Sequence, residues 1–310
     1  MAGSSDRPVV CVVGACNMDL VSFVPRLPRM GETLHGSRFH MGFGGKGANQ
    51  AVMAARLGAD VSMIAELGQD IFGRDTLENF ESVGIDTTHV HFTDEASTGV
   101  APIAVDPDGE NSIIIVMGAN DLLTEEEIEA ARAEIAAADV LVCQLEIPVE
   151  ISLKALRVAR EEGVATVFNP APAREDLPEE FYGLSTVFCP NESETELLTG
   201  MPVGAPEEDE AAARELLDRG AEAVILTLGD RGSLIVTPDS ARQVPTEKVE
   251  AVDSTGAGDA FVGSLAYFMG LDMPLEDAVR RANAIAARSV QKDGTQTSFP
   301  DREEVADLLA

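Results

Sequence analysis

A glycine-rich segment late in the chain ends in an acidic residue, Asp253-Ser254-Thr255-Gly256-Ala257-Gly258-Asp259, and an apolar stretch follows from Ala260. The pattern predicts a helix whose glycine-rich start offers bare backbone NH groups and the positive end of a helix dipole, which together can bind an anion. Asp259 could be an ordinary N-cap. Beside a bound phosphate, the same carboxylate could instead act as the base that takes a proton from an attacking alcohol.

A second glycine-rich segment, Gly42-Phe43-Gly44-Gly45-Lys46-Gly47-Ala48-Asn49-Gln50, runs into another predicted helix. Its glycines satisfy the dinucleotide-binding pattern GxGxxG, and Glu66 follows at about the distance of a ribose-binding acid. However, the residues before Gly42 do not predict the buried strand that this fold requires, and Gly47 after Lys46 argues against a Walker loop. The segment therefore predicts backbone lying close to a small ligand, with a flexible glycine hinge as the alternative.

Polar residues also follow three predicted strands. Asn17 and Asp19 come soon after the first apolar run, at the strand end where open α/β sheets bind ligands, although such residues often only form turns. Asn191 and Glu194 follow a later strand, and their amide and carboxylate oxygens would suit Mg²⁺ held through water. The segment 227–232 predicts a tight turn between two apolar strands.

Short β-branched runs alternate along the chain with amphipathic stretches. This alternation predicts an α/β fold around a mostly parallel sheet. The predicted strands are 9–13, 61–64, 140–142, 165–168, 186–188, 224–228 and 233–236. The predicted helices are 49–57, 124–137, 211–219, 260–269 and 275–288. Two segments within about 20–43 and 97–117 break this rhythm and predict a small separate sheet; no linker divides the 310 residues, so we expect a single domain.

The composition is strongly acidic, with 54 Asp and Glu against 22 Lys and Arg and a net charge of -32. This charge argues against nucleic-acid partners and, being spread along the chain, predicts adaptation to high salt; an ordinary acidic protein is the alternative. Neither a membrane-spanning run nor a secretory leader is apparent, and the four cysteines lie in or beside apolar runs. We therefore expect a cytoplasmic protein.

Together and in this order, the segments resemble the ribokinase branch of the PfkB sugar-kinase family. The resemblance extends from Val13 to Ser298 and is most specific at the two glycine-rich segments. It implies a three-layer αβα sandwich with a small β-sheet lid, which often forms a homodimer interface. It also implies ATP as co-substrate, Mg²⁺, and an activating K⁺.

Roles for single residues follow from the same resemblance. Asp259 would be the catalytic base, and Gly256, Ala257 and Gly258 would form the anion hole. Sugar hydroxyls would be bound by Asn17, Asp19, Gly45, Lys46, Asn49, Glu146 and Asp259. ATP would be bound by Asn191, Thr227, Leu228, Gly229, Asp230, Arg231, Gly232, Gly258 and Asn283. Asn191 and Glu194 would organise Mg²⁺, and the K⁺ shell would comprise Asp253, Thr255, Ser289, Lys292, Gly294 and Ser298.

The resemblance implies ATP-dependent phosphorylation of D-ribose at its 5-hydroxyl. Ribose 1-phosphate, nucleosides, deoxyribose, fructose and 2-keto-3-deoxygluconate remain alternative acceptors within the family. A sugar-sensing protein that has lost the chemistry, and a dinucleotide-binding oxidoreductase, are the alternatives from other classes.

Overall fold

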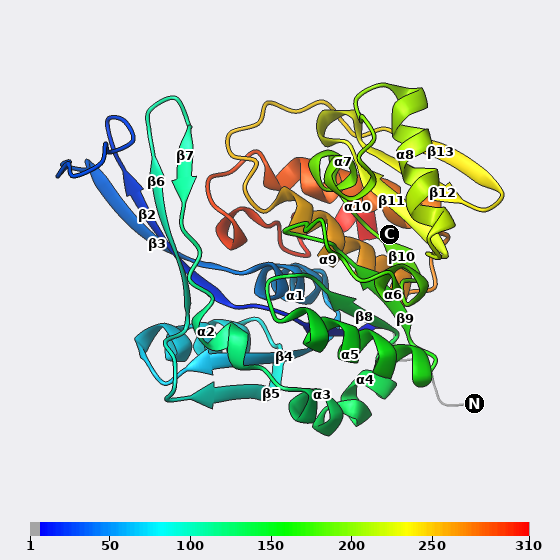
Figure 1. The fold of residues 1–310 in the computed structure, drawn as a ribbon, viewed down its shortest axis with the longest axis horizontal. Coiled ribbons are helices and arrows are strands. Elements are labelled where there is room, and N and C mark those ends of the chain that lie inside the picture. The colour runs from blue at the N-terminus through cyan, green and yellow to red at the C-terminus, as the bar shows by residue number, and fades with distance from the viewer. Residues whose placement is uncertain (1–6, 310) are drawn as a thin grey trace.

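The computed structural model describes residues 7–309, and its centre is a nine-stranded sheet (Figure 1). Most neighbouring strands are parallel, but β12 runs antiparallel to both β11 and β13. Along the sheet the order is β13 (Ser240–Val244), β12 (Ser233–Thr237), β11 (Ala223–Thr227), β10 (Val187–Phe188), β9 (Ala165–Phe168), β8 (Val140–Cys143), β1 (Val9–Val13), β4 (Asp60–Gly68) and β5 (Asp86–Thr93). The inner strands are apolar and buried, as expected for a sheet covered on both faces.

Helices cover both faces of this sheet and give the three-layer sandwich. One apolar core lies beneath α1 (Lys46–Leu57), α2 (Ile71–Ser82), α9 (Ala257–Gly270), α10 (Leu275–Ser289) and α11 (Ala306–Leu309). The other lies beneath α3 (Glu125–Ala130), α4 (Arg132–Ala137), α5 (Val149–Glu161), α6 (Glu180–Gly183), α7 (Glu192–Thr199) and α8 (Pro206–Asp218). Helices α1 and α9 pack closely, because Gly263 lets the backbone of Gln50 approach: a Cβ at Gly263 would lie 2.5 Å from the Gln50 carbonyl oxygen.

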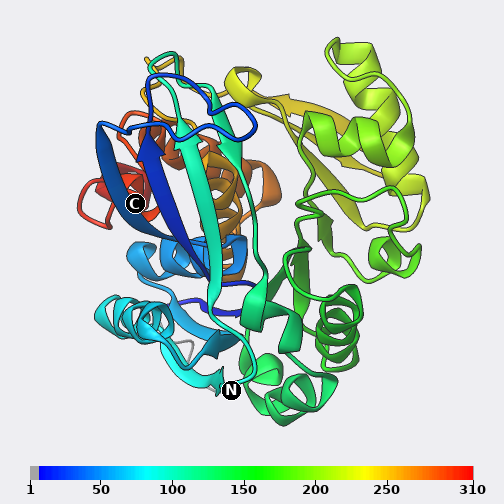
Figure 2. The ribbon, with the colours of Figure 1, turned by 60° about the vertical axis from the view of Figure 1, so that its left-hand side comes forward.

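A second sheet of four strands projects from the body as a blade, seen at the left of Figure 1 and from another side in Figure 2. Its order is β3 (Arg38–Gly44), β2 (Asn17–Phe23), β6 (Gly99–Val105) and β7 (Asn111–Ile113). Strands β2 and β6 are parallel, whereas the outer pairs are antiparallel. We call this sheet the lid; it confirms the small separate sheet that the two irregular segments predicted.

The predicted fold class is confirmed, and all seven predicted strands are present with small shifts at their ends. Asn17 and Asp19 lie inside β2, because only three residues separate β1 from the lid, so the turn-forming alternative for them does not hold. One local prediction was wrong. The predicted helix 124–137 is two short helices that meet at Ala131, whose ψ of 8° departs from helical geometry.

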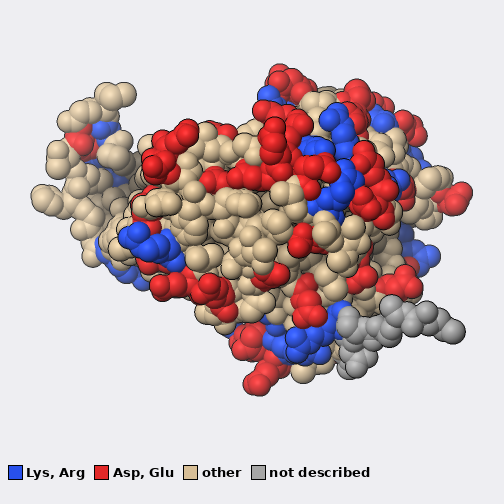
Figure 3. Space-filling model, turned by 90° about the horizontal axis from the view of Figure 1, so that it is seen from below, with Lys and Arg blue, Asp and Glu red and all other residues tan. Residues whose placement is uncertain are grey.

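Acidic side chains are scattered over the surface, with basic ones among them (Figure 3). Many arginines pair with carboxylates: Arg132, for example, contacts Glu129, Glu161 and Glu162. Among residues 7–309, no helix has the length and apolar character needed to cross a bilayer.

Candidate active site

The glycine-rich segment at 253–259 leads into α9 as predicted. Gly256 precedes the helix with a φ of 78°, a left-handed conformation that favours glycine, and a Cβ there would lie 2.6 Å from Thr295 Cγ2. The helix therefore begins with the NH groups of Ala257 and Gly258 without a capping side chain. Asp259, in the first turn and 7% exposed, places a carboxylate beside this potential anion site.

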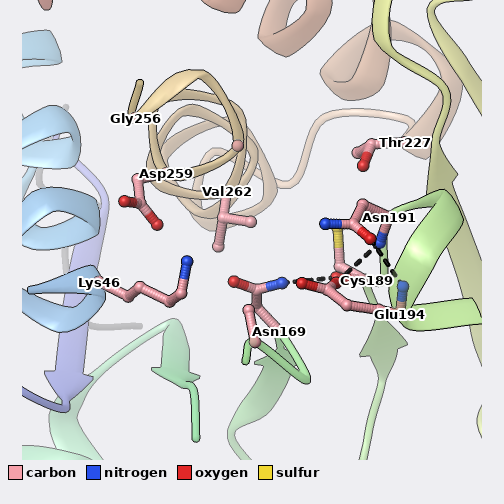
Figure 4. A pocket seen from close by; sticks show the side chains of 11 residues that line it. Lys46, Asn169, Cys189, Asn191, Glu194, Thr227, Gly256, Asp259 and Val262 are labelled. Carbon is pink, nitrogen blue, oxygen red and sulfur yellow. Dashed lines mark hydrogen bonds between the residues drawn. The ribbon is translucent and has the colours of Figure 1, made fainter. Parts of the chain in front are cut away.

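The other glycine-rich segment leads from the lid into α1. Gly45 has a φ of 86°, and a Cβ at this position would lie 2.6 Å from the Ala15 carbonyl oxygen, so the turn from β3 into α1 requires glycine. The Lys46 backbone NH donates to Glu146 Oε2 at 2.8 Å, and the Lys46 side chain extends toward Asp259 (Figure 4). Three of the predicted sugar-binding residues thus lie close together, namely Lys46, Glu146 and Asp259.

A pocket of about 170 Å³ lies between α9, α1 and the ends of the central strands (Figure 4). It brings together residues from both glycine-rich segments and from the predicted ATP and Mg²⁺ sites. Its lining consists of Lys46, Asn169, Ala171, Cys189, Asn191, Glu194, Thr227, Gly256, Gly258, Asp259 and Val262.

Carboxylates dominate the electrostatics of this region. Burial, with Glu146 and Asp259 nearby, raises the pKa of Asp19 to about 7. Burial likewise raises the pKa of Glu194 to about 7, and it raises the pKa of Glu146 despite the opposing charge of Lys46. Burial alone would lower the pKa of Lys46, but the surrounding carboxylates outweigh it and raise that pKa. The lysine therefore stays charged and neutralises part of an acidic site.

The predicted ATP residues divide into two groups. Asn191, Thr227 and Gly258 line the pocket. The remaining turn residues, 228–232, join β11 to β12; within them Arg231 pairs with Glu192 and Asp209. Asn283 is buried on α10, where its side chain accepts from Ser233 Oγ at 2.7 Å and donates to the Val244 carbonyl at 3.0 Å. The polar atoms of Asn283 thus tie α10 to the antiparallel edge of the sheet.

The residues predicted to hold cations offer oxygen donors. Asn191 and Glu194 form a reciprocal capping box at the start of α7, and Glu194 also faces the pocket. The Asp253 carboxylate accepts from the backbone NH groups of Thr255 and Gly294, both at 2.9 Å, so it joins the two loops of the predicted K⁺ shell. Although burial opposes it, these hydrogen bonds lower the pKa of Asp253 and favour its anion.

Three other members of that shell have internal partners. The Lys292 ammonium pairs with Glu304 at 2.6 Å, which leaves only its carbonyl for a cation. The hydroxyls of Ser289 and Ser298 donate to the carbonyls of Ala286 and Thr295. These donor types fit the hard oxygen ligands that Mg²⁺ and K⁺ prefer. Within residues 7–309, no group of three or more His, Cys, Asp or Glu side chains is arranged to hold a metal ion.

Several residues of the site were missed or given no role by the sequence analysis. Asn169 and Cys189 line the pocket directly after β9 and β10. Their positions at the carboxyl ends of buried strands could have identified them as candidate ligand contacts. Gln50 and Gln296 are buried beside Asp259 and Asn49. No local sequence pattern marks Gln296, which reaches the site only through the tertiary fold.

The dinucleotide alternative finds no support in the geometry. Gly42 and Gly44 belong to lid strand β3, of which Arg38, His40 and Met41 are exposed. Glu66 is buried near Glu127 at the start of α3, and burial followed by that neighbour raises the pKa of Glu66 to about 7. The lack of a predicted buried strand before Gly42 was therefore a valid argument against a dinucleotide-binding fold.

Comparisons with known proteins agree with the site. Residues 8–302 match the family model described as pfkB family carbohydrate kinase. A mouse protein named ribokinase is 49% identical over 304 residues, covering 97% of this chain and 94% of the relative. A Salmonella typhi deoxyribokinase is 41% identical over 301 residues, covering 97% and 98%.

A solved structure also resembles this chain over nearly its full length. The Arabidopsis thaliana ribokinase complexed with ribose and ATP superimposes with a TM-score of 0.90, at 31% identity and with 98% of this chain and 99% of that chain covered. Sequence, site geometry and fold thus agree, and the chain belongs to the pfkB family of carbohydrate kinases.

Proposed function

We propose that this sugar kinase transfers the terminal phosphoryl group of ATP to the 5-hydroxyl of D-ribose. The observation that carries the proposal is the position of Asp259 in the first turn of α9, at a helix start without a capping side chain and within the pocket that Lys46 also lines. The likeness to the mouse ribokinase and to the ribose-bound Arabidopsis thaliana structure supports ribose as the acceptor.

In the proposed reaction, Asp259 accepts the proton of the sugar hydroxyl as its oxygen forms a bond to the terminal phosphorus of ATP. The bond from that phosphorus to the bridging oxygen breaks and ADP leaves. The NH groups at the start of α9 stabilise the negative charge on the transferring group, and Lys46 neutralises charge between the two substrates. Because such transition states are loose, positioning and electrostatics supply most of the acceleration.

We further propose Mg²⁺ near Asn191 and Glu194, and a K⁺ activator held by Asp253, Thr255, Ser289, Lys292, Gly294 and Ser298. The fit rests on the oxygen donors described above. When bound, Mg²⁺ would neutralise phosphate charge, and K⁺ would reinforce the positive potential at the anion site. The anionic Asp253 already joins the two K⁺ loops through backbone NH groups.

The acidity of the pocket favours an uncharged acceptor. Asp19, Glu146 and Glu194 all interact with Lys46 or Asp259, so a phosphate already present on the sugar would face several carboxylates. Repulsion of this kind disfavours ribose 1-phosphate. Deoxyribose remains the second candidate, because the deoxyribokinase relative is similar over nearly the full chain.

A coupled ADP-release assay with ATP, Mg²⁺ and K⁺ tests these assignments. We expect kcat/KM to be highest for ribose among ribose, deoxyribose, ribose 1-phosphate, fructose, 2-keto-3-deoxygluconate and nucleosides. A higher value for deoxyribose would move the proposed acceptor while keeping the mechanism. Absence of turnover with every acceptor would instead support the sugar-sensing alternative.

The raised pKa of Asp19 gives a pH prediction. With a pKa of about 7, Asp19 is largely protonated below neutrality, whereas the ionised form is the stronger acceptor of sugar hydroxyl hydrogen bonds, because both of its oxygens accept. KM for ribose should therefore fall as pH rises toward about 7, by up to about tenfold per pH unit, and then level off. The D19N variant should show a higher KM without this dependence. A KM that rises with pH in the unmodified protein would contradict the assignment.

We also propose a homodimer formed through the lid, a cytoplasmic location and adaptation to high salt. Large apolar side chains are exposed on the lid and on the strand-like segment after β7, namely Phe39, Met41, Ile113, Ile114, Ile115 and Val116. Such a patch commonly marks a protein interface. The net charge of -32 is screened in molar salt, so activity and stability should both be greater there than in dilute buffer.

A further inference from the structure

Asp259 lies at the junction of two chains of buried amide side chains. Gln50 Nε2 donates to Asp259 Oδ1 at 2.9 Å, and Asn49 Nδ2 donates to Asp259 Oδ2 at 2.8 Å. Both oxygens of the carboxylate thus accept a hydrogen bond from an uncharged donor. All three side chains are at most 7% exposed, so water does not readily substitute for these contacts.

Each amide that contacts Asp259 is itself oriented by another. Gln144 Nε2 donates to Gln50 Oε1 at 2.6 Å, which leaves the nitrogen of Gln50 to face the carboxylate. On the other side, Gln296 Nε2 donates to Asn49 Oδ1 at 3.0 Å, and Asn79 Nδ2 donates to Gln296 Oε1 at 2.9 Å. The second amide of each chain therefore fixes the orientation of the first, that is, which side its oxygen faces and which side its nitrogen faces.

We propose that Gln50 and Gln296 are positioning residues that hold the Asp259 carboxylate aimed at the acceptor hydroxyl. This inference rests on the proposed role of Asp259 as the base. Amide groups are suited to the task, because they donate hydrogen bonds to a carboxylate but do not titrate near neutral pH. With one donor on each carboxylate oxygen, the arrangement fixes the direction in which the carboxylate points.

The Q50M variant tests the proposal, because methionine preserves length and apolar volume but cannot donate. We expect kcat to fall by about 10- to 100-fold, whereas KM for ribose and for ATP should change little. Q296M removes the hydrogen bond to Asn49 on the other side and should lower kcat by less. Q69M, at an exposed position outside the site, is the matched control and should behave as the unmodified protein.

A double-mutant cycle separates positioning from a structural role. In the D259N background, Q50M should cause no further loss of kcat, because the base that it positions is absent. An equal loss in both backgrounds, or an unchanged kcat in Q50M alone, would overturn the inference while leaving the kinase assignment intact. If the unmodified protein lacks sugar kinase activity, the proposed function and this inference are both overturned.

Discussion

Replacing Asp259 with asparagine is expected to lower kcat for ribose phosphorylation by about 10²- to 10⁴-fold. The substitution keeps the volume of the side chain but removes the anion that would accept the hydroxyl proton. The amide introduced by the substitution would also turn an NH₂ group toward one of the two donors, Asn49 or Gln50, that now contact the carboxylate. Steady-state kinetics over a range of pH would measure the loss, which should not be recovered at alkaline pH.

Binding of ATP provides the control for this variant. Asn191 and Thr227 line the other side of the pocket, so calorimetry should give an ATP affinity close to that of the unmodified protein. A kcat near normal in D259N, with ATP binding retained, would mean that another group accepts the proton. Loss of ATP binding together with turnover would indicate that the substitution disturbed the start of α9.

Replacing Lys46 with methionine is expected to reduce kcat/KM by about 10²- to 10³-fold. Its ammonium group interacts with Asp259, Glu146 and Glu194, and without it the negative charge of the pocket would oppose both ATP and the transition state. The charge of Lys46 also lowers the pKa of Glu146 and Glu194, so these carboxylates should bind protons more readily in the variant. Kinetics with ribose and ATP varied separately would show the effect on each substrate.

Lys154 offers a matched control, because it is a surface lysine that pairs with Glu129 away from the pocket. K154M should leave kcat/KM within about twofold of the unmodified value, since surface ion pairs contribute little. K46R should restore activity only in part, because the larger guanidinium group must fit a pocket of about 170 Å³. Activity of K46M close to normal would contradict a role for this charge.

Much of the fold could be predicted from local patterns. Buried strands such as β1 and β9 are short β-branched runs, and α9 and α10 follow from their apolar periodicity. The position of Asn17 and Asp19 could not be predicted, because nothing in segment 14–16 shows that the chain enters a second sheet after three residues. The break near Ala131 was also hidden, since the glutamate and alanine residues on its two sides are strong helix formers and favour a continuous helix.

The candidate site likewise contains some residues that the sequence marks and others that only the fold brings together. Asp259 and Lys46 stand next to glycines whose conformations are required by the local backbone, so their importance is visible in the sequence. The two amides that contact Asp259, Asn49 and Gln50, also belong to a glycine-rich segment, whereas Gln144 and Gln296 meet them only through contacts across the fold. Their role depends on which side chains the sheet order and the α1–α9 packing bring together.

The hydrogen bond between Asn49 and Gln296 joins residues 247 positions apart, and the bond between Asn49 and Asp259 spans 210 positions. During synthesis on the ribosome, the first glycine-rich segment therefore emerges long before the residues that complete the pocket. The hydrogen bonds around Asp259 and Asn49 can all form only after residue 296 has left the exit tunnel. Enzymatic activity is thus a late event in the biogenesis of this protein, and nascent chains that stop before that point would carry α1 without a working active site.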